Sequence, residues 1–111
     1  MDQAITYIVV LITTSSEQEA EAIGKALVES RLAACVNIST GVRSLFWWQG
    51  AIERQEEVLM VVKSRSDLLA SIIEAVKRLH SYTVPEVVAL PILAGSPDYL
   101  AWVDKSLRPT P

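Results

Sequence analysis

The chain has 111 residues, of which half are apolar and 21% are charged, and its net charge is −3. A chain of this size and apolar content is typical of one domain around one core, so we expect residues 1–111 to form a single domain. The mixed, slightly acidic charge excludes the basic face with which proteins bind nucleic acid or anionic membranes, so we expect neither partner.

The compartment is predicted from the start of the chain and from its cysteine content. Residues 1–3 include Asp2 and lack the basic start of a secretory signal. The apolar run over residues 5–12 is far below the ~20 residues that a membrane helix needs. Cys35 is the only cysteine, which excludes an internal disulfide and suits a reducing compartment. We therefore expect a soluble, cytoplasmic protein.

The first predicted elements are a strand and a helix. Residues 4–13 are β-branched and almost continuously apolar, which is typical of a strand buried on both faces. Ser16 and Glu19 have the spacing of a capping box, in which each side chain binds the backbone amide of the other residue. Apolar residues then recur at helical spacing, so residues 17–31 are predicted to form a helix that lies on a sheet.

A long hairpin is predicted next. Residues 34–48 form its first strand with a bulge at Gly41, Gln49 and Gly50 form a tight turn, and residues 51–63 form the partner strand. At ~3.3 Å per residue the first strand would extend roughly 50 Å. A compact domain of this length has a radius of gyration of ~13 Å. The tip of the hairpin is therefore predicted to project beyond the core.

The second half begins with a helix and a strand. Ser64 or Ser66 is predicted to cap a helix whose apolar stripe extends over residues 69–79. A strand is predicted over residues 84–92, and Pro91 places its end at a sheet edge or a bulge.

A third, short helix completes the pattern. Ser96, Pro97 and Asp98 supply a cap, a proline at the first helical position and a negative charge near the amino end of the helix. The order strand, helix, strand, strand, helix, strand predicts two right-handed crossovers and a four-stranded antiparallel sheet with two helices on one face. This is the ferredoxin-like βαββαβ arrangement of the α+β class, here with a long central hairpin and a short C-terminal helix.

The hairpin tip predicts an oligomer interface at Phe46, Trp47 and Trp48. Adjacent strand residues face opposite sides, so a single sheet can bury only one of the two tryptophans well. Exposed apolar patches of this kind mark interfaces, and the sheet face opposite the helices has the same need for cover. In the alternative, the tip folds back and the third helix covers that face.

Three segments carry a resemblance to a known family. They are LVESRLAACVNI at residues 27–38, SLFWWQGAI at residues 44–52 and HSYTVPEVVALPI at residues 80–92. The chain resembles the CutA family of divalent-cation tolerance proteins over nearly its whole length. The resemblance implies a tight homotrimer with PII-like architecture and a role in tolerance of copper and other divalent cations. Ser81 and Thr83 depart from the family pattern, which usually has a proline and a glutamate there.

Three residues are candidate metal ligands for a weakly bound copper ion or another divalent cation. His80, Glu86 and Cys35 offer nitrogen, oxygen and sulfur, although their spacing matches no metal motif and a trimer would have to combine copies. Alternatively, Cys35 is a small buried core residue, and His80 complements the C-terminal dipole of the second helix. If His80 lies beside Glu86, its pKa should be raised.

A rival prediction is a ligand cleft formed by Lys63, Tyr82 and Trp48. A lone ammonium beside His80 and Tyr82 suits a small anionic ligand, with Trp48 as a secondary platform. The protein would then be a PII-like sensor that signals to a partner protein. Glu57 is predicted to be a solvated rim charge. The chain lacks a glycine-rich phosphate loop, a nucleophile elbow and a Ser–His–Asp pattern, so we expect neither an enzyme nor an organic cofactor.

Overall fold

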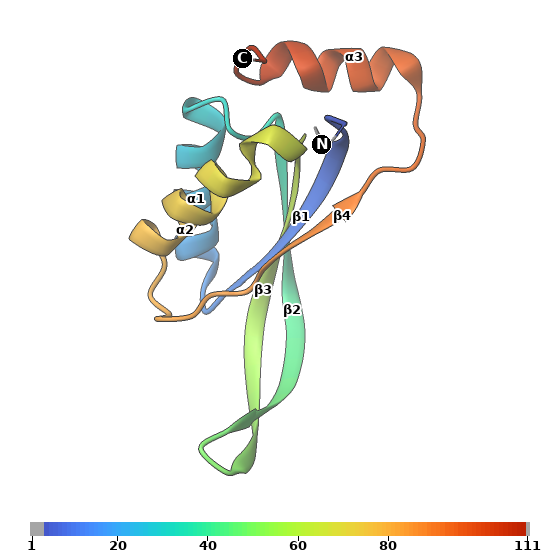
Figure 1. Ribbon diagram of the computed structural model, residues 1–111. Helices are drawn as coiled ribbons and strands as arrows, with labels where there is room; N and C mark the ends of the chain where they lie inside the picture. Colours follow the sequence, from blue (N-terminus) through green and yellow to red (C-terminus); the bar gives the residue numbers. More distant parts are fainter. Residues whose placement is uncertain (1–3, 111) are drawn as a thin grey trace.

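The computed structural model describes residues 4–110, which form one antiparallel sheet, two helices on one of its faces and a third helix at its end (Figure 1). Residues 1–3, where the sequence lacks the basic start of a secretory signal, and residue 111 lie outside the described residues. The elements are β1 Tyr7–Thr14, α1 Glu17–Glu29, β2 Cys35–Trp48, β3 Ala51–Arg65, the 3₁₀ turn η1 Ser66–Leu68, α2 Leu69–Leu79, β4 Val87–Pro91 and α3 Pro97–Ser106.

The sheet has the strand order β2-β3-β1-β4, and all its neighbouring strands are antiparallel. The predicted order of elements and the four-stranded antiparallel sheet are therefore confirmed. β1 lies between two strands, but helices cover only one of its faces, so the prediction that it is buried on both faces is wrong. Its residues alternate between half-buried and buried over most of its length. β4 is an edge strand, as Pro91 predicted, and it ends at Pro91, one residue before the predicted end. Of the helices in the described part of the chain, none is long and apolar enough to cross a membrane.

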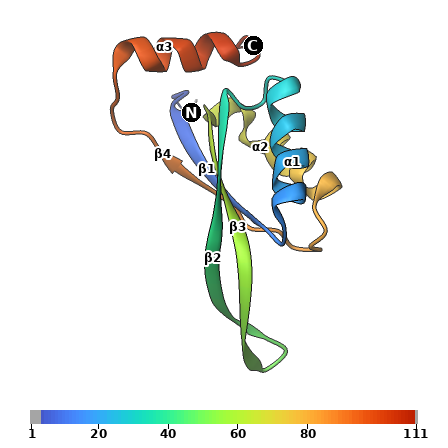
Figure 2. The same ribbon diagram turned by 180° about the vertical axis from the view of Figure 1, so that it is seen from behind.

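The core lies between the sheet and the helices α1 and α2, which cover the same face in both views (Figures 1 and 2). Alternate residues of β1 and β3 point into it because side chains alternate along a strand. Gly24 lets α1 approach β2 closely, since a Cβ atom there would lie 3.2 Å from Cγ1 of Val36. The strand residues of the core include Ile8, Val10, Ile12, Val58, Met60 and Val62.

The other face of the sheet is left largely uncovered, and we call it the open face. The helix α3 lies across one end of the sheet rather than over this face (Figures 1 and 2). The alternative prediction, that the third helix covers the face, is therefore wrong. The apolar residues of the open face are half-buried or exposed: Val9, Leu11, Leu59, Val61, Val88 and Leu90.

The β2–β3 hairpin projects from the body of the molecule as predicted (Figure 1). The radius of gyration is 14.8 Å and the longest extent is 43 Å, against a radius of ~13 Å for a compact chain of about this length. The register shifts between Ser39 and Val42, and Gly41 has φ +78°, which confirms the bulge. Gln49 and Gly50 both have positive φ, as in the tight turns that suit hairpins.

Three residues predicted as candidate helix caps have other roles or make no capping bond. Ser64 belongs to β3, where its hydroxyl donates to the carbonyl of Leu32 at 2.6 Å. Ser66 accepts a hydrogen bond from the amide of Thr6 at 2.9 Å, and η1 leads into α2 without a side-chain cap. Ser96 precedes α3 but its side chain makes no capping bond. Tertiary partners therefore replace the local role that the sequence pattern predicted for Ser64 and Ser66.

Candidate functional site

His80 ends α2, and its side chain is fully buried between α2 and the end of β1. Its Nε2 lies 2.7 Å from the carbonyl oxygen of Thr13, and its Nδ1 lies 3.0 Å from the backbone amide of Tyr82. A neutral imidazole satisfies both contacts, because Nε2 donates to the carbonyl while Nδ1 accepts from the amide. Both ring nitrogens are thus engaged within the chain.

Glu19 is the acidic neighbour of His80, in place of the predicted Glu86. Its Oε2 accepts a hydrogen bond from the amide of Ser81 at 2.8 Å, and its Oε1 lies 4.0 Å from Nδ1 of His80. Burial favours the protonated acid, but the hydrogen bonds from Ser81 and Ser15 outweigh it and hold the pKa of Glu19 below its ordinary value. Glu86 is exposed at the residue before β4.

The capping box is consequently only half formed. Ser16 accepts from the amide of Glu19 at 3.1 Å as predicted. The carboxylate of Glu19 instead joins α1 to the turn after α2, 62 residues along the chain. Sequence reasoning found Glu19 but missed this role, because the local spacing carries no information about so distant a partner.

Tyr82 connects the turn to the base of the hairpin. Its hydroxyl donates to Oε2 of Glu57 at 2.9 Å and accepts from Nε2 of Gln55 at 3.2 Å. Burial and the neighbouring Glu57 carboxylate raise the pKa of Tyr82 to about 12. The Tyr82 ring also lies 4.6 Å from the ring of His80, centroid to centroid. Glu57 is 8% exposed, so the prediction of a solvated rim charge was wrong.

Lys63 and Cys35 lie elsewhere on the sheet. They are directly paired across β2 and β3, and Nζ of Lys63 donates to Oδ1 of Asn37. Sγ of the half-buried Cys35 lies 3.9 Å from the same oxygen. Within one chain Tyr82 contacts β3 further along, at Gln55 and Glu57, so these contacts do not form the predicted pairing of Lys63 with Tyr82.

The three predicted metal ligands do not converge within one chain. Cys35 pairs with Lys63, which pairs in turn with Val9 near the start of β1. His80 binds Thr13 near the end of the same strand. Across residues 4–110 there is no group of three or more His, Cys, Asp or Glu side chains placed to hold a metal ion.

The hairpin tip, residues 45–52, exposes both tryptophans. Trp47 is 73% exposed and Trp48 is 58% exposed, so a single chain buries neither, although the sequence predicted that it could bury one. The tip extends past β1 and both packed helices, and the alternative that it folds back is therefore wrong (Figure 1). Leu45 and Ile52 are also largely exposed, and Phe46 is 37% exposed.

Comparison with known proteins identifies relatives over nearly the whole chain. The profile of the CutA1 divalent ion tolerance protein family matches residues 8–106. The divalent-cation tolerance protein CutA of Thermus thermophilus is 53% identical over 95 residues, which cover 86% of this chain and 92% of the relative. The protein of the same name from Archaeoglobus fulgidus is 46% identical over 99 residues, covering 89% and 96%.

Solved structures agree with the sequence comparison. The crystal structure of CutA1 from Oryza sativa matches with a TM-score of 0.92 at 39% identity, covering 95% of this chain and 96% of that one. The structure from Thermus thermophilus has a TM-score of 0.90 at 49% identity, covering 92% and 99%. Sequence and architecture thus lead to the same assignment, and the chain belongs to the CutA1 divalent ion tolerance family.

Proposed function

We propose that this protein is a non-enzymatic, cytoplasmic homotrimer of ferredoxin-like subunits, assembled in a PII-like manner, that binds divalent cations of the copper type. Its family supports the cation part, because relatives 53% and 46% identical are named divalent-cation tolerance proteins. The observation that carries the assembly part is the exposure of two apolar surfaces, the hairpin tip and the open face.

Assembly would cover both surfaces together. A monomer that left Trp47, Trp48 and Leu45 in water would carry the kind of patch that marks an interface. Obligate interfaces are large and apolar, and the open face continues the apolar surface on the body of the molecule. Sedimentation equilibrium at low micromolar concentration tests this proposal. A trimer supports it, a dimer contradicts the three-fold closure, and a folded monomer contradicts the assembly altogether.

The cation site would lie between subunits, because the candidate ligands of one chain are far apart. Cys35 and Glu86 are at least partly accessible and offer a thiolate and a carboxylate. Nδ1 of His80 would first have to give up the amide of Tyr82 before it could bind a metal. The proposal therefore places Cys35 and Glu86 ahead of His80 as ligands.

Calorimetric titration of the assembled protein with Cu²⁺, and with Zn²⁺ as a second cation, tests the site. Cys35→Ser and Glu86→Gln should each reduce affinity at least about tenfold, as loss of a metal-site group commonly does. Glu21→Gln on the exposed surface of α1 serves as the control. Unchanged affinity in both ligand variants would remove these residues from the site, and no heat in the wild type would remove the site itself.

A second candidate function is the PII-like sensor, and Lys63 is the observation that favours it. Lys63 is half-buried on the open face, and its ammonium donates to Asn37, close to Cys35. A small anionic ligand bound there would raise the melting temperature, because binding to the native state stabilises it. A thermal-shift screen of nucleotides and small carboxylates, with Lys63→Gln as the matched variant, separates this function from cation binding.

The cytoplasmic part of the proposal rests on Cys35, the only cysteine, which suits a reducing compartment. Relatives differ in their stated location. Those of rice and Arabidopsis thaliana are named chloroplastic, and the Archaeoglobus fulgidus structure is described as periplasmic. Fractionation of cells that express the tagged protein tests the proposal, and recovery in the periplasm or in an organelle would contradict it.

A further inference from the structure

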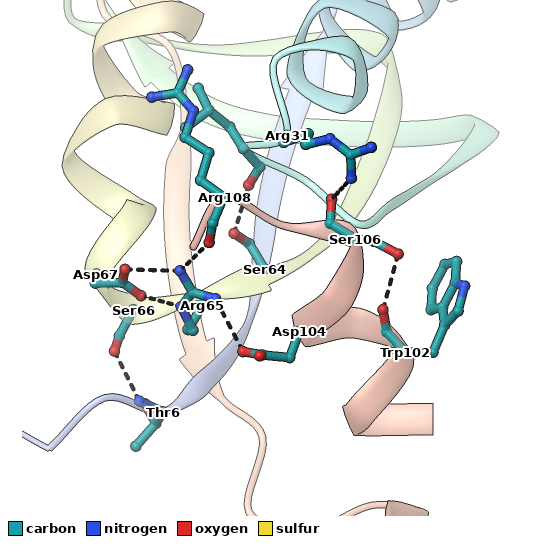
Figure 3. Close-up of polar contacts among 11 residues, drawn as sticks. Thr6, Arg31, Ser64, Arg65, Ser66, Asp67, Trp102, Asp104, Ser106 and Arg108 are labelled. Carbon is teal, nitrogen blue, oxygen red and sulfur yellow. Dashed lines mark hydrogen bonds and ion pairs between the residues drawn. The ribbon is translucent and has the colours of Figure 1, made fainter. Parts of the chain in front are cut away.

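Arg65 at the end of β3 is a buried charge with four hydrogen bonds (Figure 3). Its side chain is 2% exposed. Nε and Nη2 donate to the two carboxylate oxygens of Asp67, at 2.5 and 3.0 Å. Nη1 donates to Oδ1 of Asp104 at 3.0 Å, and Nη2 also donates to the carbonyl of Arg108 at 2.6 Å. We call these four residues the Arg65 clamp.

The clamp joins two separate parts of the fold. Asp67 lies in η1, two residues after Arg65, whereas Asp104 is in α3 and Arg108 follows that helix. The Asp67 contact is therefore local, and the contacts with Asp104 and Arg108 hold the C-terminal segment onto the sheet. Asp67 alone gives Arg65 a bidentate carboxylate partner, which is the strongest geometry for a guanidinium.

Other groups around the clamp come from β1 and from the end of α1. The hydroxyl of Tyr7 lies against Asp104, and burial together with that carboxylate raises the pKa of Tyr7. Nη1 of Arg31 donates to the carbonyl of Ser106 at 3.3 Å. Nε of Arg108 donates to the carbonyl of Ser30 at 2.9 Å. These contacts are exposed, so water can replace them when the segment moves.

Apart from these contacts and a backbone hydrogen bond from the amide of Arg108 to the carbonyl of Arg31 at 3.0 Å, few buried residues hold α3. Within it only Val103 is buried, and Leu107 at its C-cap is the other buried apolar residue of the segment. Tyr99 and Trp102 are 42% and 47% exposed. Residues 93–96, which connect α3 to the sheet, are exposed and belong to neither helix nor strand. The connection can therefore act as a hinge.

We propose that α3 and the residues after it form a releasable latch, which detaches from the sheet as a unit while the sheet, α1 and α2 stay folded. Removing one partner of a buried ion pair is costly when it leaves the other charge unpaired. Here Asp67 keeps Arg65 paired after α3 leaves. The Asp104 carboxylate that is lost is already 48% exposed, so it returns to water easily.

Release changes the surface that the molecule presents. Tyr7 and Arg65 are register partners, and they continue the open face at the end that α3 crosses. When α3 detaches, Tyr7 and Arg65 become part of the open face, and Val103 and Leu107 become exposed. The latch therefore sets how much apolar surface is available beside the face through which subunits are proposed to associate.

Hydrogen exchange of the full chain, read by mass spectrometry, tests the latch. In the wild type the amides of residues 101–107 should exchange at least about tenfold faster than those of residues 59–64 in β3, as expected for a separate opening unit. Asp104→Asn should speed exchange in α3 by a further factor of about ten, the lower end for a hydrogen bond to a charged group, and leave β3 unchanged. Asp104→Glu, which keeps the carboxylate, should restore part of the protection.

The control is Lys105→Gln, since Lys105 is exposed and lies beside Asp104 without belonging to the clamp. It should change neither region. Equal protection of α3 and β3 in the wild type would overturn the proposal, because α3 would then open only with the whole fold. Unchanged exchange of α3 in Asp104→Asn would also overturn it, because the clamp would not be the contact that holds the helix.

Discussion

The turn after α2 and the tip of the hairpin differ in whether a single chain provides the partners and the cover that their side chains need. At the turn, His80, Ser81 and Tyr82 find hydrogen-bond partners on β1, α1 and β3, respectively. At the tip, Trp47 and Trp48 remain largely in water. Polar groups with complete partners stabilise the subunit, whereas apolar groups without cover require another chain.

The comparison separates stability from association. Changes at the turn should lower the stability of the subunit, because they leave buried polar groups without partners. Changes at the tip should alter assembly and hardly change the subunit. Four variants or conditions test this separation, and their effects are expected to decrease in the following order.

The largest effect is expected for His80→Ala. It removes the partners of the Thr13 carbonyl and the Tyr82 amide and leaves a cavity, so the free energy of unfolding should fall by about 3 kcal/mol. Urea unfolding at one fixed protein concentration measures it, because association also contributes to stability. Glu21→Gln is the control, since Glu21 is exposed on α1 and belongs to neither the turn nor a candidate metal site. If the free energy of unfolding fell by no more than the scatter of the control measurements, His80 would not be the residue that holds the turn.

Trp48→Ala should act on assembly. Full burial of this side chain in an interface contributes roughly 1.5–3 kcal/mol, so its removal should weaken association by about 10–100-fold per subunit. The circular dichroism spectrum should stay unchanged, because Trp48 is 58% exposed in the single chain. Sedimentation equilibrium measures the association. Lys63→Ala should weaken it less, and the reverse order would contradict burial of the tip.

Tyr82→Phe should lower the free energy of unfolding of the subunit by a smaller amount, about 1–2 kcal/mol, because Glu57 stays buried but loses a hydrogen-bond donor. The substitution should also change how the stability of the protein depends on pH in the alkaline range. The pKa of Tyr82 is raised to about 12 in the fold, so its contribution is complete below the unfolded value of about 10 and is lost as pH rises towards 12. Denaturation between pH 9 and 12 should therefore be less steep in the variant.

The smallest and most gradual effect is expected in acid. The pKa values of Glu19 and Asp67 are lowered in the fold by hydrogen bonds and, for Asp67, by Arg65. Their contribution is present above the unfolded pKa of about 4 and is lost as pH falls through the folded value. Glu19→Gln and Asp67→Asn should each flatten the acid limb of a stability–pH curve, and Trp48→Ala should not. If stability fell equally steeply with decreasing pH in all three variants, Glu19 and Asp67 would not be the groups responsible for the acid dependence.

Much of the fold follows from local patterns. Gly41 and the pair Gln49–Gly50 predicted the bulge and the turn correctly, because positive φ angles favour glycine and a few other residues. The long apolar and β-branched runs predicted the central strands. The ends of the elements were predicted less accurately: β4 begins at Val87, the register partner of Ile12, rather than at residue 84.

The candidate site was predictable only in part. The segment from His80 to Glu86 was recognised, but its partners Glu19, Gln55 and Glu57 were not found or were assigned other roles. Glu57 looked like a surface charge because it stands in the polar half of β3, which extends beyond the core. Its burial depends on Tyr82, which arrives from 25 residues away.

The amino-acid sequence by itself determined the periodicity of each element, the length of the hairpin and the aromatic residues at its tip, because these depend on neighbours within a few residues. Only the tertiary structure decided which polar groups meet. The partners of His80, Tyr82 and Arg65 lie up to 67 residues away, and their choice depends on where α2 and α3 come to rest against the sheet. Hydrogen bonds act over about 3 Å, so small differences in that placement select one partner over another.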